Sequence, residues 1–280
     1  MKIIFPELDN PLAQAAIRNF PDISFLSAPD LATAAKMLSQ HQADSMISGL
    51  DYSSRDVVVT YKNYLPLKSP YFSSCFICEK EGQHFAIADG GVNKTPSEDQ
   101  LYIIVEDTAK TYAAYYQEAP RIAMLSYSTN GSGGKNPDLA KIHFVIEKIR
   151  QSHQDWQIDG EMQLDAAINP EISAKKFPTS QIAGRANILI TPDLNSGNIL
   201  YKSIEQFGGF TIAGPIIQGF EMPLADLSRG SNTKDIILTI DILRNQILLS
   251  RDRTRLTRSG MSEAPPVTTG RSERVPKSNI

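Results

Sequence analysis

The residues best suited to chemistry lie where a polar segment leads into an apolar one, near the end of the chain. Asp226-Leu227-Ser228-Arg229-Gly230 is followed by Asn232 and Asp235, which have the spacing of a capping box at the start of a helix. Apolar residues then recur at i, i+4, i+7 and i+11, as on the buried face of a helix: Ile236, Ile240, Leu243 and Ile247. Ser228 and Arg229 are therefore predicted to lie in a loop that feeds a helix N-terminus.

Such a helix start favours the chemistry of anions. Its free amide groups and the positive end of the helix dipole attract an anion, and the planar guanidinium of Arg229 fits a phosphate. Asp235, in the first helical turn, would serve as a general base if its surroundings raise its pKa. The spacing alone leaves a structural alternative open, in which Asp235 only caps the helix and Arg229 only forms an ion pair.

A second candidate site is the Gly-rich segment from Ser126 to Lys135. It joins an apolar strand predicted over Ile122–Ser128 to a helix predicted over Asp138–Arg150. Its small residues could hold a phosphate or a nucleotide through backbone amides. The segment has neither the P-loop order nor the dinucleotide-binding fingerprint. A simple tight turn therefore stays open as the alternative.

Three acids occur within a short stretch, at Asp159, Glu161 and Asp165. No histidine stands at metal-ligand spacing, because His143 and His153 lie upstream. We therefore predict a solvated turn and strand here, and no metal site.

Cys75 and Cys78 have the spacing of a redox pair. The neighbouring Phe72, Phe76 and Ile77 predict a strand, in which residues three apart point to opposite faces. This geometry excludes both a disulfide and a shared metal, so we predict two structural thiols.

The elements that must position these residues alternate between apolar strands and helices. The strands show no period-two alternation, which favours parallel strands buried on both faces within a three-layer α/β architecture. The predicted strands are Lys2–Phe5, Ser45–Gly49, Ile122–Ser128, Ala186–Ile190 and Phe210–Ala213, and the predicted helices are Pro11–Asn19, Leu31–Gln42, Asp138–Arg150 and Ile236–Leu249.

Composition narrows the class of protein. The chain has 280 residues, of which 41% are hydrophobic and 21% charged, with a net charge of −3. These values predict a globular protein with no basic field for nucleic acid, and no segment is apolar enough for a membrane helix. Two cysteines and a strand-like N-terminus indicate a cytoplasmic protein without a signal peptide. The arginine- and proline-rich tail after Ser250 is predicted to be disordered, and a basic arm for an anionic partner is the alternative reading.

Taken together, many short segments resemble the phosphate acetyltransferase and phosphate butyryltransferase family. The matching segments in chain order are Ala43–Gly49, Ser73-Ser74, Ala88-Asp89, Asn93, Ala123–Thr129, Asp159–Ala167, Ala183–Asn187, Pro192–Asn198, Tyr201-Lys202, Gly214–Gly219 and Asp226–Gly230. Each segment is weak alone, but so many in family order make chance similarity very improbable.

The resemblance implies an enzyme that moves an acetyl or other short acyl group between coenzyme A and inorganic phosphate. By position, Asp235 matches the base that deprotonates the coenzyme A thiol, Arg229 the phosphate-binding arginine, and Ser228 a hydroxyl near the thiol and carbonyl. The matched segments also supply the expected substrate-binding residues, which are Ser128, Thr129, Asn187, Asn198, Lys202 and Gly230. No metal or organic cofactor is implied, since coenzyme A is a substrate.

The resemblance also implies an architecture of two three-layer αβα domains, similar to isocitrate and isopropylmalate dehydrogenases, with a cleft between them. Domain I would comprise residues 1–67 and 220–250, domain II residues 68–219, and residues 251–280 a disordered tail. Acyl-CoA, phosphate and acyl phosphate would be the partners, and the protein would form a homodimer in the cytoplasm.

Departures from the family pattern concern positive charge. No arginine follows Phe5-Pro6-Glu7, Val58-Val59-Thr60 replaces an Arg-Pro pair, and Asn130 and Gln206 stand near positions of a lysine and an arginine. Each lost charge-assisted contact would cost roughly 1.5–3 kcal/mol. A second hypothesis is therefore a catalytically weakened or inactive paralogue that binds coenzyme A or acyl phosphate, or acts as a scaffold. Arg55 and Arg185 are the arginines that could compensate.

Overall fold

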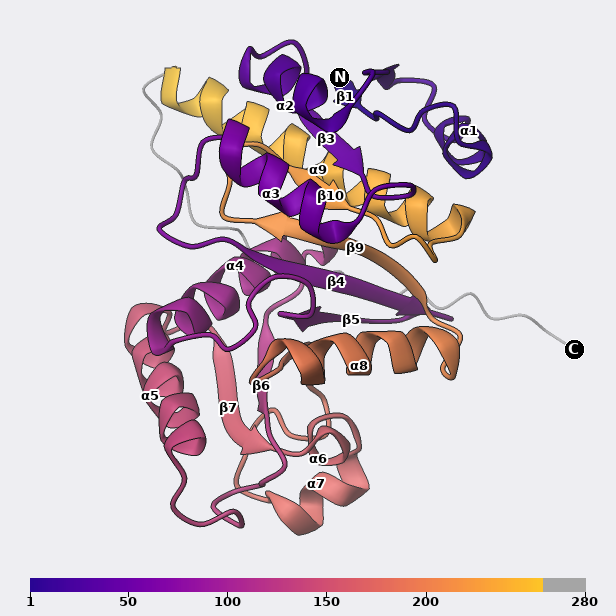
Figure 1. The fold of residues 1–280 in the computed structure, drawn as a ribbon. Coiled ribbons are helices and arrows are strands. Elements are labelled where there is room, and N and C mark those ends of the chain that lie inside the picture. The colour runs from indigo at the N-terminus through magenta and orange to yellow at the C-terminus, as the bar shows by residue number, and fades with distance from the viewer. Residues whose placement is uncertain (259–280) are drawn as a thin grey trace, which may run out of the picture. The chain divides into compact units, whose positions relative to one another are not determined.

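The computed structural model describes residues 1–258, and residues 1–247 form one compact unit. Its strands form one mixed sheet in the order β2-β1-β3-β10-β9-β4-β5-β8-β6-β7 (Figure 1). The strands are β1 (Lys2–Ile4), β2 (Ser24–Leu26), β3 (Ser45–Ser48), β4 (Ser73–Lys80), β5 (Gln83–Ala88), β6 (Arg121–Leu125), β7 (Gln157–Met162), β8 (Ile188–Ile190), β9 (Thr211–Gln218) and β10 (Leu224–Asp226).

Helices cover both faces of this sheet. They are α1 (Pro11–Ile17), α2 (Leu31–Ser39), α3 (Ser54–Tyr64), α4 (Glu98–Tyr116), α5 (Pro137–Ser152), α6 (Leu164–Ile168), α7 (Pro170–Lys176), α8 (Leu194–Gln206) and α9 (Thr233–Arg258). One continuous core joins α1, α4, α5 and α9 to one face. The other face carries two separate cores, one under α2 and α3 and one under α6, α7 and α8. This layered arrangement confirms the predicted α/β fold class.

The prediction of an all-parallel sheet was wrong for its centre. β4 pairs antiparallel with both β5 and β9, and β9 pairs antiparallel with β10. A tight turn at Glu81 and Gly82, both with positive φ, joins β4 to β5 as a hairpin. Strands buried on both faces look alike in sequence whatever their direction, so the apolar runs did not show the reversal.

The chain is expected to pass from one domain to the other after Leu67 and after Gly219, and these two points lie side by side. Lys68 N donates to Gly219 O at 3.0 Å, and Leu67 forms a β-bridge with Phe220. One sheet nevertheless continues across this boundary, so it contains strands from both expected domains. The division into domains I and II stays a prediction.

The two cysteines occupy opposite faces of β4, as predicted. Cys75 belongs to the core under α4 and α9, whereas Cys78 belongs to the core under α8. Both thiols are free and fully buried, and burial raises their pKa. They are structural residues, because a thiol of raised pKa is a poor nucleophile.

The last helix extends further than the sequence indicates. α9 runs to Arg258, past Ser250, where ordered structure was expected to end. The rest of the tail predicted to be disordered, residues 259–280, lies outside the described residues. None of the helices that the structure describes is both long enough and apolar enough to cross a membrane.

Candidate active site

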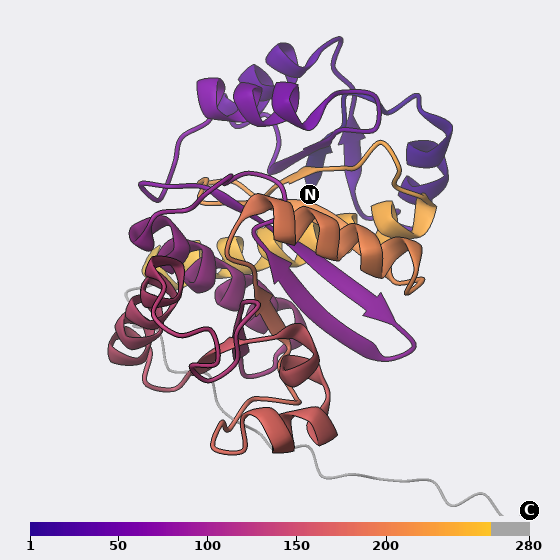
Figure 2. The same ribbon diagram turned by 60° about the horizontal axis from the view of Figure 1, so that its bottom comes forward.

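A pocket opens on the face of the sheet where the helical cover is divided. In Figure 1, α3 (purple) and α8 (orange) lie on this face, and α9 lies on the other. The beginning of α3, one side of α8 and the loop between β10 and α9 contribute to its walls, and Figure 2 shows the same elements from below. The pocket has a volume of about 610 Å³ and is lined by Tyr52, Ser54, Phe76, Gly90, Gly91, Leu194, Asn198, Tyr201, Lys202, Glu205, Gln206, Pro215, Leu227, Ser228, Arg229 and Gly230.

The loop that carries Ser228, Arg229 and Gly230 is a compact turn. Leu227 N donates to Ser48 O at 2.5 Å, which ties the start of the loop to β3. Ser231 N donates to Ser228 O at 2.8 Å, and Gly230 N donates to the Ser228 hydroxyl oxygen at 3.2 Å. Because the Ser228 oxygen accepts from the loop, its own proton is free to point to a ligand.

The start of α9 has the predicted capping box. Asn232 Oδ1 accepts from Lys234 N at 2.8 Å and from Asp235 N at 3.3 Å, and Asp235 Oδ2 accepts from Asn232 N at 2.8 Å. Asp235 Oδ1 accepts from Ile212 N at 2.9 Å, so the carboxylate also ties α9 to β9.

Asp235 itself is almost inaccessible. Its side chain is 1% exposed and is not among the residues that line the pocket. Burial raises the pKa of Asp235, while the two backbone donors oppose the shift. The raised pKa suits a base, but the geometry is that of a residue that fixes the loop. The catalytic role of Asp235 stays a prediction.

Positive charge in the pocket comes from two side chains. Arg229 is exposed on the loop, and Lys202 projects from α8 with its Nζ 4.9 Å from the Tyr201 ring centre. Arg229 is the one arginine among the described residues that line the pocket. Arg55 and Arg185 do not line it, and the Arg185 Nε donates instead to Gln181 O at 2.8 Å. Neither of these arginines replaces the missing family charges in this pocket.

The beginning of α3 adds to the preference for anions. Ser54 is the first residue of this helix and lines the pocket, and the Ser53 hydroxyl caps it by accepting from Asp56 N at 3.2 Å. The positive end of the α3 dipole therefore faces the same space as Arg229.

An apolar wall completes the pocket. The rings of Phe76 and Tyr201 stack with centres 3.8 Å apart and an interplanar angle of 15°, and Pro215 and Leu227 lie beside the same space. Asn198 Nδ2 donates to Gly90 O at 3.2 Å and holds α8 against the Gly90–Gly91 turn. The pocket therefore combines a cationic side with an apolar side.

Three of the residues expected to bind substrate lie elsewhere. Ser128 is buried, where its hydroxyl donates to Glu161 Oε1 at 2.7 Å and accepts from Gly133 N at 2.7 Å. Thr129 Oγ1 accepts from Gln163 N at 2.9 Å, and Asn187 Oδ1 accepts from Arg121 N at 2.7 Å. These contacts shape the Gly-rich turn and the start of β6, outside the pocket.

The acidic segment predicted to be a solvated turn and strand lies on β7 and at the start of α6, and the prediction was wrong for Glu161. Glu161 is fully buried, and its oxygens contact the Ser128 hydroxyl, Gly131 N and His143 Nε2, the last at 2.7 Å. Asp165 pairs instead with Lys176 at 2.7 Å. Among the described residues, no three metal-ligating side chains come together.

Sequence reasoning missed much of the pocket wall. It identified Ser228, Arg229, Gly230, Asn198 and Lys202, which the structure brings together. Five other lining residues stand in segments or at a position that the sequence analysis named without giving them a role in binding: Leu194, Tyr201, Gln206, Pro215 and Leu227. The residues that it did not connect with the site are Tyr52, Ser54, Phe76, Gly90, Gly91 and Glu205. Ser53 three residues before Asp56 was the available signal for the start of α3, because this spacing is typical of a helix cap.

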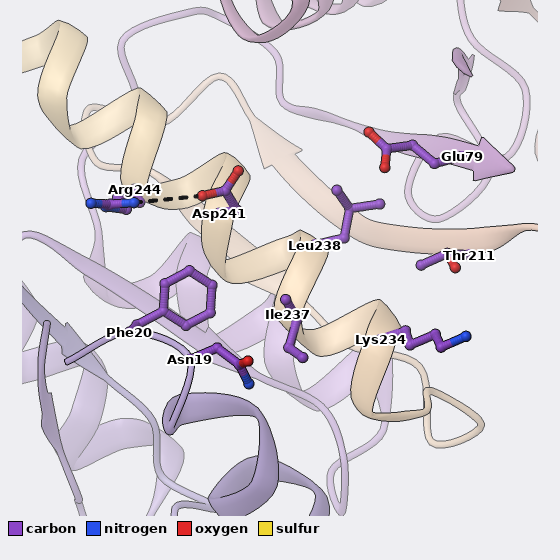
Figure 3. A pocket seen from close by; sticks show the side chains of 9 residues that line it. All are labelled: Asn19, Phe20, Glu79, Thr211, Lys234, Ile237, Leu238, Asp241 and Arg244. Atoms are coloured by element: carbon purple, nitrogen blue, oxygen red, sulfur yellow. Dashed lines mark ion pairs between the residues drawn. The ribbon is translucent and has the colours of Figure 1, made fainter. Parts of the chain in front are cut away.

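A second pocket, of about 460 Å³, lies along α9 (Figure 3). Phe20, Ile237 and Leu238 give it an apolar floor, with Lys234 toward one end and Arg244 toward the other. Arg244 is already paired with Asp22 at 2.9 Å and lies 3.9 Å from Asp241. This pocket contains none of the predicted site residues, so the first pocket is the better candidate for the active site.

Comparison with known proteins shows the family to which the chain is similar. The chain matches the family described as phosphate acetyl/butaryl transferase over residues 24–243. It is 37% identical over 218 residues to phosphate acetyltransferase of Treponema pallidum, which covers 74% of this chain and 65% of that relative. The corresponding protein of Corynebacterium glutamicum is 36% identical over 208 residues, covering 74% of this chain and 63% of the relative.

A solved structure extends the similarity to most of the fold. The crystal structure of a phosphotransacetylase from Streptococcus pyogenes has a TM-score of 0.78 with this chain at 30% identity, covering 89% of this chain and 94% of the other. The chain spans less than two thirds of the length of the two curated relatives.

Proposed function

The chain belongs to the phosphate acetyl/butaryl transferase family, and we propose that it is a phosphate acyltransferase that moves an acetyl or other short acyl group between coenzyme A and inorganic phosphate. The observation that carries the proposal is the pocket in which Ser228, Arg229 and Lys202 face an apolar wall. This combination suits a substrate that has a phosphate at one end and a short acyl group at the other.

The pocket residues have distinct proposed roles. Arg229 and Lys202 hold the phosphate, and the start of α3 adds the field of its helix dipole. The Ser228 hydroxyl and the Gly230 turn lie where negative charge develops on the carbonyl oxygen, as acyl transfer requires. Asn198 fixes α8 and lies beside the substrate.

The reaction joins a thiolate to an acyl carbon. The thiol of coenzyme A loses its proton, its sulfur attacks the carbonyl carbon, and the bond from that carbon to the phosphate oxygen breaks. The electron pair of this bond leaves with the phosphate, and the thioester remains. By resemblance to the family, Asp235 is the base that removes the proton of the coenzyme A thiol.

The test is phosphate-dependent thiol release from acetyl-CoA, followed with a thiol reagent. We expect turnover by the wild type, and a fall in kcat/KM for phosphate of about 10- to 100-fold in Arg229→Ala, as expected for a lost charge-assisted hydrogen bond. Arg55→Ala is the matched control, because Arg55 is exposed nearby but does not line the pocket. Absence of phosphate-dependent turnover in the wild type would overturn the proposal. Calorimetric binding of coenzyme A without turnover would instead support the binding or scaffold function.

Four further properties are proposed from family membership. The substrates are acyl-CoA, phosphate and acyl phosphate, and the protein acts as a homodimer in the cytoplasm. No metal or organic cofactor takes part, so dialysis against EDTA should leave turnover unchanged. Light scattering measures the dimer, and a monomer at assay concentration would contradict it.

A further inference from the structure

The turn after β5 is built around one buried carboxyl group, that of Asp89, which is 2% exposed. Its Oδ1 accepts from the Ser74 hydroxyl on β4. The same oxygen accepts from Gly91 N at 3.0 Å and from Val92 N at 3.1 Å. Its Oδ2 accepts from Asn93 N at 3.0 Å and from Asn93 Nδ2 at 2.6 Å. Five donors therefore hold this single side chain.

No basic side chain takes part in this arrangement. Within the described residues, no lysine, arginine or histidine forms an ion pair with Asp89. A buried carboxyl group without an ion pair depends on its hydrogen bonds to offset the loss of water. Four of its five donors belong to residues 91–93. The carboxyl group and the backbone of the turn therefore fix each other in place.

The turn that Asp89 closes forms part of the pocket wall, because Gly90 and Gly91 line the pocket. Its backbone also lies directly against the first turn of α8. A Cβ on Gly197 would lie closer than 3.0 Å to Asp89 O, and a Cβ on Gly90 would lie 3.1 Å from Gly197 C. Asn198, the next residue of α8, donates from Nδ2 to Gly90 O at 3.2 Å. The turn and the helix leave no room between them, so a displacement of the turn displaces α8.

Two side chains of the proposed site depend on the place of α8. Asn198 and Lys202 both line the pocket and lie one helical turn apart on the same side of the helix. A helix moves as a rigid element, so a shift at Gly197 moves both of them. Ser228 and Arg229 lie on a different element, the loop after β10, and are not held by this contact.

We propose that Asp89 is a positioning residue of the acyl-transfer site, an inference that rests on the proposed function. Asp89 does not itself line the pocket. Its carboxyl group fixes the Gly90–Gly91 turn, the turn sets the place of α8, and α8 holds Lys202 against the phosphate. Loss of this carboxyl group should therefore weaken the binding of phosphate more than it slows the reaction of bound substrates.

The experiment measures KM and kcat for phosphate in the thiol-release assay with acetyl-CoA. Asp89→Asn keeps the size of the side chain but turns an NH₂ group toward donors of the turn. It should raise KM for phosphate by about 10-fold, as expected when one charge-assisted contact is displaced, and should change kcat less. Gly197→Ala leaves the carboxyl group intact but forces α8 away from Asp89 O, so it should give the same result.

A double-mutant cycle separates positioning from a general loss of stability. In a Lys202→Ala background, Asp89→Asn should raise KM for phosphate by less than about 2-fold, because the charge that Asp89 positions is already gone. Asp30→Ala is the structural control. Asp30 Oδ1 caps α2 by accepting from Thr33 N at 2.7 Å and does not line the pocket, so its loss should lower the Tm and leave KM unchanged.

Thermal unfolding establishes that each variant is folded at the assay temperature. An unchanged KM for phosphate in folded Asp89→Asn or in folded Gly197→Ala overturns the inference and leaves the proposed function intact. The same holds if Asp89→Asn has an equal effect with and without Lys202. If Asp89→Asn does not fold, Gly197→Ala decides alone. A wild type without phosphate-dependent turnover overturns the proposed function, and this inference with it.

Discussion

Asp226 and Asp235 enclose the pocket loop from its two ends, and each is 1% exposed, but only Asp235 has both carboxylate oxygens occupied by backbone amides. Asp235 is thus bound into the helix start, whereas Asp226 is buried without a donor. The two acids therefore differ in what their removal should do to stability and to its dependence on pH.

Replacing Asp226 by asparagine should stabilise the protein, and increasingly so at higher pH. The pKa of Asp226 is about 7 in the folded chain and 3.8 ordinarily. Between these values the folded state holds a proton that the unfolded state has lost, so the free energy of unfolding falls as pH rises. The loss reaches at most about 4 kcal/mol and is complete above pH 7. The Asp226→Asn variant has no carboxyl group to ionise at this position, so its free energy of unfolding does not fall for this reason as pH rises.

Thermal unfolding of the wild type and Asp226→Asn between pH 4 and 8 measures the effect. The difference in Tm should widen up to about pH 7 and then stay constant, following the pKa of Asp226. Exposed Asp9→Asn is the control and should show no such trend. A constant difference across this range would mean that Asp226 is not protonated in the folded protein.

Replacing Asp235 by alanine should destabilise the protein. The change leaves Ile212 N without its acceptor in the core and removes half of the capping box at Asn232. Lost caps and buried unpaired donors each cost about 1–2 kcal/mol. Urea unfolding should therefore show a lower midpoint for Asp235→Ala, whereas the exposed neighbour Lys234→Ala should leave it nearly unchanged. An equal effect of both changes would contradict the structural role of Asp235.

The sequence predicted the local features of the site well, because they depend on short-range rules. The capping box at Asn232 and Asp235 and the opposite faces of Cys75 and Cys78 follow from helix and strand periodicity alone. The antiparallel direction of β9 depends on pairings far apart in the chain, and the apolar runs contain no sign of it.

The remaining pocket residues could not be predicted for the same reason. Ser54 and Phe76 reach the pocket only because β4, α3 and α8 come together in the folded sheet. Ser128 looked like a ligand-binding residue because it stands in a Gly-rich turn. Glu161, which lies 33 residues further along the chain on β7, instead accepts a hydrogen bond from its hydroxyl. A sequence pattern gives the type of a side chain but not its partner.

The ring of Tyr201 should limit the length of the acyl group. It stacks on Phe76 in the apolar wall of the pocket, so Tyr201→Ala opens space there. Each added methylene that finds room is worth about 1–3 kcal/mol in specificity. The ratio of kcat/KM for butyryl-CoA to that for acetyl-CoA should therefore rise at least about 10-fold. Tyr201→Phe keeps the ring and should keep the ratio; a similar rise in this variant would argue against the steric explanation.

Gly49 should tolerate no side chain, because it lies against the first residues of the pocket loop. Its φ is +113°, and a Cβ there would lie closer than 3.0 Å to Leu227 O, Asp226 Oδ1 and Leu227 N, nearer than a Cβ can approach other atoms. Gly49→Ala must therefore displace the loop in addition to straining its own backbone. Gly82 is the matched comparison, since its φ is +81° but a Cβ would meet nothing within 4 Å. Gly82→Ala should cost only about 1 kcal/mol of backbone strain. Gly49→Ala should cost at least about 2 kcal/mol more and also lower the rate of acyl transfer. Urea unfolding and thiol-release assays on both variants measure this, and equal losses would show that the loop does not depend on the close contact with Gly49.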